Sequence, residues 1–238
     1  MNRTALDHQL HDLRQTVITM GLHVDTAILE STAILQTASS SLALSVNSQV
    51  DQIHRGRLCI ENMTATVITL HQPTLGDLRA ALGAMNMAMN LEHIGYLARN
   101  NARLASELGE SQMSEGSLRQ SLSALAAATR SQVQAALAAY QASSVRQAVA
   151  IQARDEEVGL LCAAFTTSSR STVREHPEHM LAGTNLLWIA QNLERMADHA
   201  ATMCEHVIAM ATGYQPVPEM NPAVEGAITN RRAASAAV

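Results

Sequence analysis

Aromatic side chains are almost missing from this sequence, which has one Trp, one Phe and three Tyr in 238 residues. Glycine and proline are also scarce, with 11 and 5 residues. Because strands favour aromatic and β-branched residues and need turn residues between them, this composition argues against a β-rich fold. Ala, Leu, Met and Ser dominate instead, which is typical of helices that pack closely through small side chains.

The sequence has neither an excess of positive charge nor a long apolar run. The formal net charge is −5, which gives no basic surface for nucleic acid. The N-terminus, MNRTALDHQLHDLR, has no apolar signal region, and the longest apolar runs, 158–165 and 186–190, are too short to span a bilayer. We therefore predict a soluble, cytoplasmic protein that does not bind DNA or RNA.

The three cysteines, Cys59, Cys162 and Cys204, are isolated from one another and form no C-x-x-C pair. Cys162 and Cys204 fall at apolar positions of helical patterns. We therefore expect reduced thiols packed in a helical core rather than a disulfide or a reactive site.

The strongest helical pattern runs from 184 to 213. Apolar or small residues recur every three or four positions, at Leu186, Ala190, Leu193, Ala197, Ala200, Cys204, Val207 and Ala211. Gly213 is expected to end this helix. With a turn of about 100° per residue, Glu194, Asp198 and Glu205 should share one flank of the apolar stripe. The neighbouring Arg195, His199 and His206 should point away from it.

The segment 84–105 repeats this register, with Leu91-Glu92 aligning on Leu193-Glu194. Helices are predicted over 7–36, 44–70, 75–108, 118–140 and 145–170, with a sixth after His176-Pro177. The predicted fold is therefore all-α, with two tandem, structurally similar three-helix bundles built from six long helices. The first bundle covers 1–110 and the second 111–213, and the tail 214–238 is expected to be poorly ordered.

Four motifs in this order resemble the PhoU family, which accompanies the bacterial high-affinity phosphate transport system. Gln72-Pro73 is followed by Asp77-Leu78-Arg79. Leu91-Glu92-His93-Ile94-Gly95 stands where the family has L-E-R-I-G-D, and Asp155-Glu156-Glu157-Val158 where it has D-x-x-V-D. The segment 193–200, LERMADHA, matches L-E-R-I-G-D-H-A. The resemblance covers Asp7 to Gly213.

The resemblance implies a fold, a role and partners. PhoU proteins have two similar three-helix bundles side by side and are commonly homodimers. They are non-catalytic regulators that contact a phosphate ABC transporter and a membrane sensor histidine kinase, so that uptake and the phosphate-starvation genes stay repressed when phosphate is plentiful. They would reach the membrane only through these partners. Family members can bind metal ions through E-x-x-x-D carboxylate pairs.

In the second half, Glu194 and Asp198 form such a pair, because residues four apart stand one above the other on a helix. Asp155 lies in the apolar stripe of its own helix and needs a partner there. A hard cation, Mg, Mn, Fe or Ca, would satisfy Asp155, Glu194 and Asp198, with Glu205 as a weaker ligand. The alternative is that these acids are solvated or paired with arginine. Gly159 replaces the second acid of D-x-x-V-D and weakens the metal interpretation.

The first half departs further from the metal-binding pattern. Tyr96 stands where Asp198 stands in the second half, and Arg99 and Arg103 match Ala201 and Glu205. On the preceding helix, Val50 and His54 match Asp155 and the second acid. Glu92 should therefore face arginines and be neutralised by an ion pair, so we predict that this bundle has lost its metal site. The alternative is that His54 and Glu92 act as replacement ligands.

Two further clusters have a structural and a functional interpretation. Asp77 suits the first turn of a helix, and Arg79 contacts either a partner protein or a neighbouring acid. The ten histidines match no zinc motif. We therefore interpret the cluster of His176 and His179 with Glu175 and Glu178 as a capping turn at the start of the sixth helix, where acids complement the helix dipole.

Other functions remain open alongside phosphate regulation. One is a metal-dependent enzyme or iron-storage bundle that uses Asp155, Glu194 and Asp198, although no inward-facing E-x-x-H pair supports a di-iron centre. Another is a plain helical scaffold whose acidic rows only aid solubility. A third is a diverged paralogue with a different partner. We find no catalytic triad or phosphate-cradling glycine loop, so we expect no enzymatic activity.

Overall fold

The computed structural model describes residues 3–37, 39–108, 116–152 and 155–213. All regular structure in these residues is helical, which confirms the predicted all-α fold. The elements in order are α1 (Arg3–Thr37), α2 (Ser40–His71), α3 (Leu75–Leu108), α4 (Gly116–Gln141), α5 (Val145–Gln152), α6 (Asp155–Glu175), the 3₁₀ turn η1 (Pro177–His179) and α7 (Met180–Thr212). None of the helices described here is long and apolar enough to cross a membrane.

Local sequence signals set the ends of several helices. Gln72 adopts a left-handed conformation (φ 42°) after α2, just before Pro73, which cannot continue a helix. The next helix, α3, covers the predicted range. Gly213 ends α7 with φ 73°, a conformation that glycine adopts without strain, and its N–H donates to the Ala209 carbonyl at 2.9 Å.

The second half differs from the prediction at its middle helix. A single helix was expected over 145–170, but the structure describes two pieces, α5 and α6, on either side of residues 153–154. The second piece also continues to Glu175, because no helix breaker occurs before Pro177. The expected connector, 109–115, and the tail, 214–238, lie outside the described residues.

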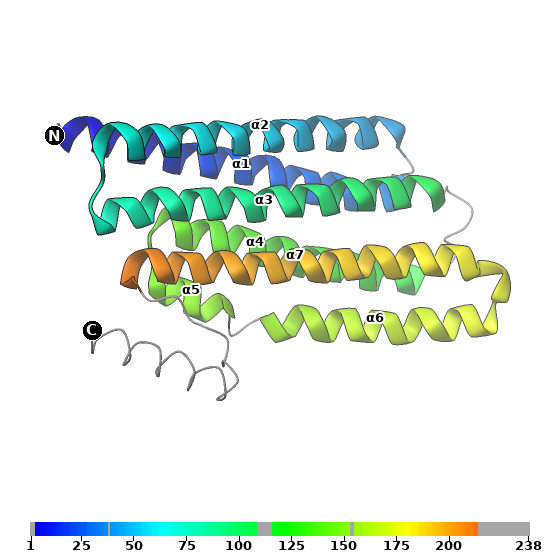
Figure 1. Ribbon diagram of the computed structural model, residues 1–238. Helices are drawn as coiled ribbons and strands as arrows, with labels where there is room; N and C mark the ends of the chain where they lie inside the picture. Colours follow the sequence, from blue (N-terminus) through cyan, green and yellow to red (C-terminus); the bar gives the residue numbers. More distant parts are fainter. Residues whose placement is uncertain (1–2, 38, 109–115, 153–154, 214–238) are drawn as a thin grey trace, which may run out of the picture.

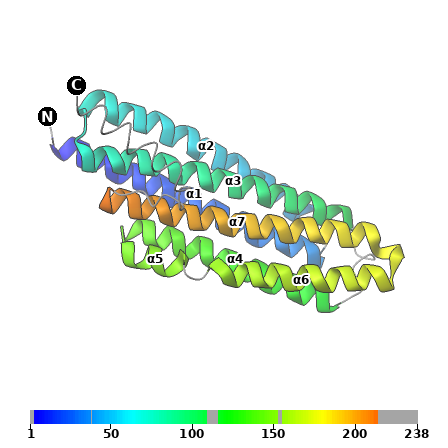
Figure 2. The same ribbon diagram turned by 60° about the horizontal axis from the view of Figure 1, so that its bottom comes forward.

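The helices lie side by side in two groups, α1 to α3 and α4 to α7 (Figure 1). At the centre, α3 and α7 run antiparallel against each other, and the second view shows the same pairing (Figure 2). A second contact joins α1 to α4. The two helices that carry the repeated Leu-Glu motif are therefore the central pair of the molecule.

Small residues allow this close approach of the two groups. A Cβ added to Gly21 of α1 would lie 2.5 Å from Cδ1 of Leu137 on α4, and one added to Gly83 of α3 would lie 1.9 Å from Sδ of Met210 on α7. Neither space admits a larger residue without displacing its neighbour. The composition poor in aromatic residues thus serves tight helix–helix packing.

Two of the three cysteines are in the core, as expected, and one is not. Cys162 and Cys204 are buried, whereas Cys59 is exposed on α2. All three are free thiols. The prediction of a core position was wrong for Cys59, because the buried stripe of α2 passes through Val50, Ile53 and Ile60 and leaves Cys59 on the flank.

Candidate functional site

The motif glutamate of the first bundle, Glu92 on α3, is enclosed by donors and cations. Its Oε1 lies 2.7 Å from Nδ1 of His54 and accepts at 3.3 Å from the Tyr96 hydroxyl. Its Oε2 lies 2.8 Å from Nε of Arg57, an ion pair whose angle is too bent for a good hydrogen bond. The Glu92 side chain is only 14% exposed, so these partners take the place of water.

These contacts also affect the groups around Glu92. The close contact with Glu92 raises the pKa of the Arg57 guanidinium, which therefore stays charged. Desolvation raises the pKa of the Tyr96 phenol, and the Glu92 charge raises it further. Tyr96 thus remains a hydrogen-bond donor to the carboxylate.

The ion pair expected at Glu92 is present, but the predicted arginines do not form it. Arg99 donates instead to Asp51 of α2 at 2.8 Å, and Arg103 pairs with Glu107 one turn further along α3. The partner is Arg57, on the neighbouring helix α2. Sequence alignment of the two halves could not identify Arg57, because the contact depends on how α2 packs against α3.

The motif glutamate of the second bundle, Glu194 on α7, has different neighbours. A Cβ added to Gly159 of α6 would lie 3.9 Å from Glu194 Oε1. Burial, and then contact with the Glu194 carboxylate, raise the pKa of the Cys162 thiol to about 12. Among the described residues, no salt bridge to Glu194 is found.

The neighbours of the two glutamates occupy equivalent positions. Val50 and His54 align with Asp155 and Gly159 at an offset of 105 residues, and the same offset places Arg57 at the position of Cys162. The first bundle therefore presents an imidazole and a guanidinium where the second presents a hydrogen atom and a thiol.

The other predicted metal ligands are spread along the second bundle. Asp198 is exposed and Glu205 is half-buried on α7. Asp155 begins α6, and its side chain lies outside the described part of the chain. Within the described residues, no group of three mutually close metal donors includes Glu194, Asp198 or Glu205.

The turn between Glu194 and Asp198 is anchored from α4. The Thr129 hydroxyl donates to the Leu193 carbonyl at 3.2 Å, and the Gln132 amide donates to the Ala197 carbonyl at 3.5 Å. Both side chains are buried. These bonds fix the motif turn of α7 within its own bundle, and sequence reasoning did not single out either residue.

Asp77 and Arg79 are engaged at one end of the molecule. Asp77 Oδ2 accepts from Nη1 of Arg3 at 2.7 Å, which ties the start of α3 to the start of α1. The Arg79 guanidinium lies over Gly213, where an added Cβ would be 2.9 Å from Nη1. A positive charge at this position suits the C-terminal end of the α7 dipole.

Polar contacts cross between the two central helices. Asn192 donates to Asn101 Oδ1 at 2.8 Å in the buried interface, and His199 Nδ1 lies 2.9 Å from Asn90 Oδ1. The His93 and His199 rings stack with centroids 5.1 Å apart. Burial lowers the pKa of His199, and the neighbouring His93 and Arg195 lower it further.

His199 was predicted to point away from the apolar stripe of α7, and there its ring contacts α3. The prediction considered one buried face, but α7 packs against its own bundle and also against α3. His206 is likewise half-buried, and burial lowers its pKa.

An ion pair also joins α1 to α4. Arg130 of α4 donates to both Asp25 carboxylate oxygens on α1, at 2.7 and 2.8 Å.

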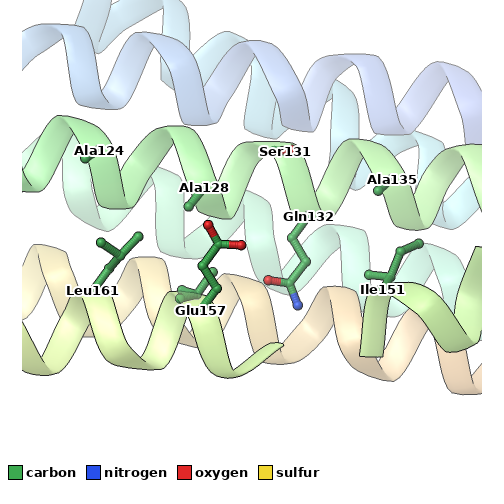
Figure 3. Close-up of a pocket in the computed structure, with 9 residues that line it drawn as sticks. Ala124, Ala128, Ser131, Gln132, Ala135, Ile151, Glu157 and Leu161 are labelled. Carbon is green, nitrogen blue, oxygen red and sulfur yellow. The ribbon is translucent and has the colours of Figure 1, made fainter. Parts of the chain in front are cut away.

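A cleft of about 370 Å³ lies between α4 and the pair α5 and α6. Figure 3 shows the Glu157 side chain reaching from α6 towards Ala128 of α4, with Gln132 extending from α4 towards α6. Apolar side chains, including Ile151 and Leu161, form most of the remaining lining. The cleft exists because α4 presents alanines where larger residues would fill the groove.

Relatives of the chain share its length and its fold. It is 29% identical over 216 residues to the phosphate-specific transport system accessory protein PhoU homolog of Rhizobium meliloti, covering 91% of each chain. The crystal structure of PhoU from Pseudomonas aeruginosa is 26% identical, covers 87% of this chain and 99% of that chain, and superposes with a TM-score of 0.81. PhoU from Streptococcus pneumoniae, 24% identical with 90% of this chain and 100% of that chain covered, shares the fold with a TM-score of 0.82.

The family comparison also reveals the internal repeat. The model of the PhoU domain matches twice, over residues 17–105 and 122–207. The first match contains Glu92 with its partners on α2, and the second contains Glu194 with its neighbours on α6. The chain therefore belongs to the PhoU family.

Proposed function

We propose that the protein is a non-catalytic regulator of phosphate uptake and signalling. In this role it couples a phosphate ABC transporter to a membrane sensor histidine kinase and represses the phosphate-starvation response when phosphate is plentiful. The observation that carries the proposal is the double PhoU domain match, together with a relative of nearly equal length that is named an accessory protein of the phosphate transport system.

The proposal includes the partners and the place of action. The protein acts as a homodimer in the cytoplasm and meets the membrane through the cytoplasmic subunit of the transporter and through the kinase. Its long rigid helices suit it to docking rather than to chemistry, because the polar groups of the central interface are used in contacts between helices. Asp77 and Arg79 remain proposed partner contacts, although both already contact other parts of the chain.

We further propose a cation site in the second bundle. Asp155, Glu194 and Asp198 would hold Mg, Mn, Fe or Ca, with Glu205 as a weaker ligand, and the cation would neutralise the acidic flank of α7. Support comes from α6, which places Gly159 and the neutral thiol of Cys162 beside Glu194, where the first bundle has His54 and Arg57 beside Glu92. The first bundle does not fit a metal, because Arg57 and His54 already hold the Glu92 carboxylate.

Recovery of partners from cells tests the regulatory role. We expect tagged full-length protein from phosphate-replete cells to recover the cytoplasmic parts of the transporter and the kinase, and deletion of the gene to raise expression of phosphate-starvation genes in rich phosphate. If neither partner is recovered and expression is unchanged, the proposal is wrong. An Asp77→Ala variant that folds normally but loses a partner would assign that contact to Asp77.

Metal binding is tested separately with Mn²⁺ and two matched variants. We expect Glu194→Gln to weaken Mn²⁺ binding by about tenfold or more, since a ligand is lost, and Glu92→Gln to leave it unchanged. Equal affinity in both variants would contradict the site. A protein that binds no Mn²⁺, Mg²⁺, Fe²⁺ or Ca²⁺ and recovers no partner would support the plain scaffold instead.

A further inference from the structure

The corner between α6 and α7 brings together three side chains that the regulatory role does not use. Pro177 opens the 3₁₀ turn η1, and the His179 N–H donates to the His176 carbonyl at 3.0 Å. In a 3₁₀ helix, residues three apart lie on the same side. The backbone therefore directs His176 and His179 towards one another, with Glu178 between them in the sequence.

The side-chain atoms at this corner are close together. His176 Nδ1 lies 3.2 Å from Glu178 Oε1, and the two imidazole rings are 5.8 Å apart between centroids. One donor atom from each of the three residues lies within 4.8 Å of the other two. Within the described residues, these three are the only such set of His, Cys, Asp or Glu.

The capping role predicted from the sequence does not account for this cluster. His176 precedes η1 and His179 precedes α7, but neither side chain makes a capping hydrogen bond. Glu178 does complement the helix start, because a hydrogen bond to its own backbone lowers its pKa, and His176 lowers it further. The imidazole positions are thus not explained by helix capping.

We propose that His176, Glu178 and His179 form an exposed site for a borderline transition metal, with Zn²⁺ as the natural occupant. Two imidazoles and one carboxylate are a donor set that suits Zn²⁺, and also Ni²⁺ and Cu²⁺, better than Mg²⁺ or Ca²⁺. Donor atoms around a tetrahedral metal at about 2.0 Å are about 3.3 Å apart. His176 and Glu178 are exposed and His179 is half-buried, so small side-chain rotations would bring the three atoms to that spacing.

The site would link the end of α6 to the start of α7. His176 follows the last residue of α6, and His179 directly precedes the first residue of α7. With three protein ligands, the fourth position stays open to water. This site differs from the proposed acidic cation site in its ligands and its metal, so either can fail without the other.

Zinc titration of the full-length, untagged protein tests the proposal. We expect calorimetry or a competing chromogenic chelator to show that the wild-type protein binds one equivalent of Zn²⁺. The double variant His176→Ala/His179→Ala should not bind it. Substituting Co²⁺ should give the visible absorption of a tetrahedral centre with nitrogen and oxygen ligands. Glu178→Gln should weaken Zn²⁺ binding by about tenfold or more, as expected for a lost ligand.

Two matched variants separate a built site from general surface binding. His8 and His11 are also exposed and three residues apart, on α1, so His8→Ala/His11→Ala should retain the Zn²⁺ equivalent. Glu175 directly precedes His176 but belongs to no close group of metal donors among the described residues, and it accepts a hydrogen bond from Ser171. Glu175→Gln therefore removes the same charge as Glu178→Gln but should retain Zn²⁺ binding. Equal losses in test and control variants, or no Zn²⁺ binding by the wild-type protein, would overturn the proposal.

Discussion

Glu92 and Glu194 occupy matching positions on the two central helices, but their surroundings differ in charge. Glu92 lies against Arg57 and His54 of α2. At the equivalent positions beside Glu194, α6 has Cys162 and Gly159. The motif glutamate is retained in both halves, so this difference in surroundings comes from the middle helices, α2 and α6.

This comparison shows that the two halves of a duplicated fold can treat the same glutamate differently. A nearly buried carboxylate needs compensation, and the protein supplies it within the first bundle. In the second bundle the Cys162 thiol lies beside Glu194, and a neutral thiol does not cancel the carboxylate charge. The first glutamate is therefore compensated within its own bundle, whereas the cation site that we propose lies beside the second.

The largest effect is expected for Arg57→Ala. The substitution leaves the Glu92 charge, whose side chain is 14% exposed, without its guanidinium partner. Removing one member of a mostly buried ion pair costs about 2–3 kcal/mol of unfolding free energy, somewhat less than for a fully buried pair. Urea unfolding followed by circular dichroism measures the loss.

Arg55→Ala is the matched control for that measurement. Arg55 is exposed two residues earlier on α2, and its Nε donates to the Asp51 carbonyl. We expect a change below about 0.5 kcal/mol, as for most surface substitutions. Equal losses for Arg55→Ala and Arg57→Ala would show that the Glu92 ion pair does not stabilise the first bundle.

A smaller difference is expected between Glu92→Gln and Glu194→Gln. Neutralising Glu92 leaves Arg57 and His54 without their shared anion, so we expect a loss of about 1–2 kcal/mol. Neutralising Glu194 removes a charge beside a thiol. The unfolding free energy of the metal-free protein should therefore change by less than about 0.5 kcal/mol, or increase. Thermal unfolding in a chelator compares the two variants, and a larger loss for Glu194→Gln would reverse the assignment.

Periodicity and helix-end signals in the sequence predicted most of the fold. The range of α3 and the end of α7 at Gly213 followed from residues close in the chain. The internal duplication followed from the Leu-Glu motif repeated in the two halves. The contacts of Glu92 did not, because Arg57 reaches it from another helix. The contact of His199 with Asn90 was missed for the same reason, since a single apolar stripe does not show that α7 has a second neighbour in α3.

The alkylation rates of Cys59 and Cys162 are expected to differ by about tenfold. Burial raises the pKa of Cys162 to about 12, so almost no thiolate is present there at pH 8, whereas Cys59 is exposed. Iodoacetamide should therefore modify Cys59 at least about tenfold faster than Cys162. Peptide mass spectrometry over time reports each rate, and Cys59→Ser should leave only slow modification. Equally fast modification of Cys162 would mean that a thiolate lies beside Glu194. It would contradict the difference described above, in which Glu194 has a neutral thiol where Glu92 has the charged Arg57.

The smallest effect is expected for Gly159→Ala, at the position that His54 occupies in the first bundle. An added Cβ would have one close neighbour outside its own helix, Glu194 Oε1 at 3.9 Å, which is an ordinary contact. Alanine is favoured over glycine inside a helix by about 0.5–1 kcal/mol, so the variant should be more stable by that amount. Gly183→Ala is the control, because its Cβ would lie 2.3 Å from Val173 Cγ2 and should destabilise the protein. A loss of stability in both variants would mean that the space beside Glu194 is already filled, and that the second bundle encloses its glutamate as tightly as the first.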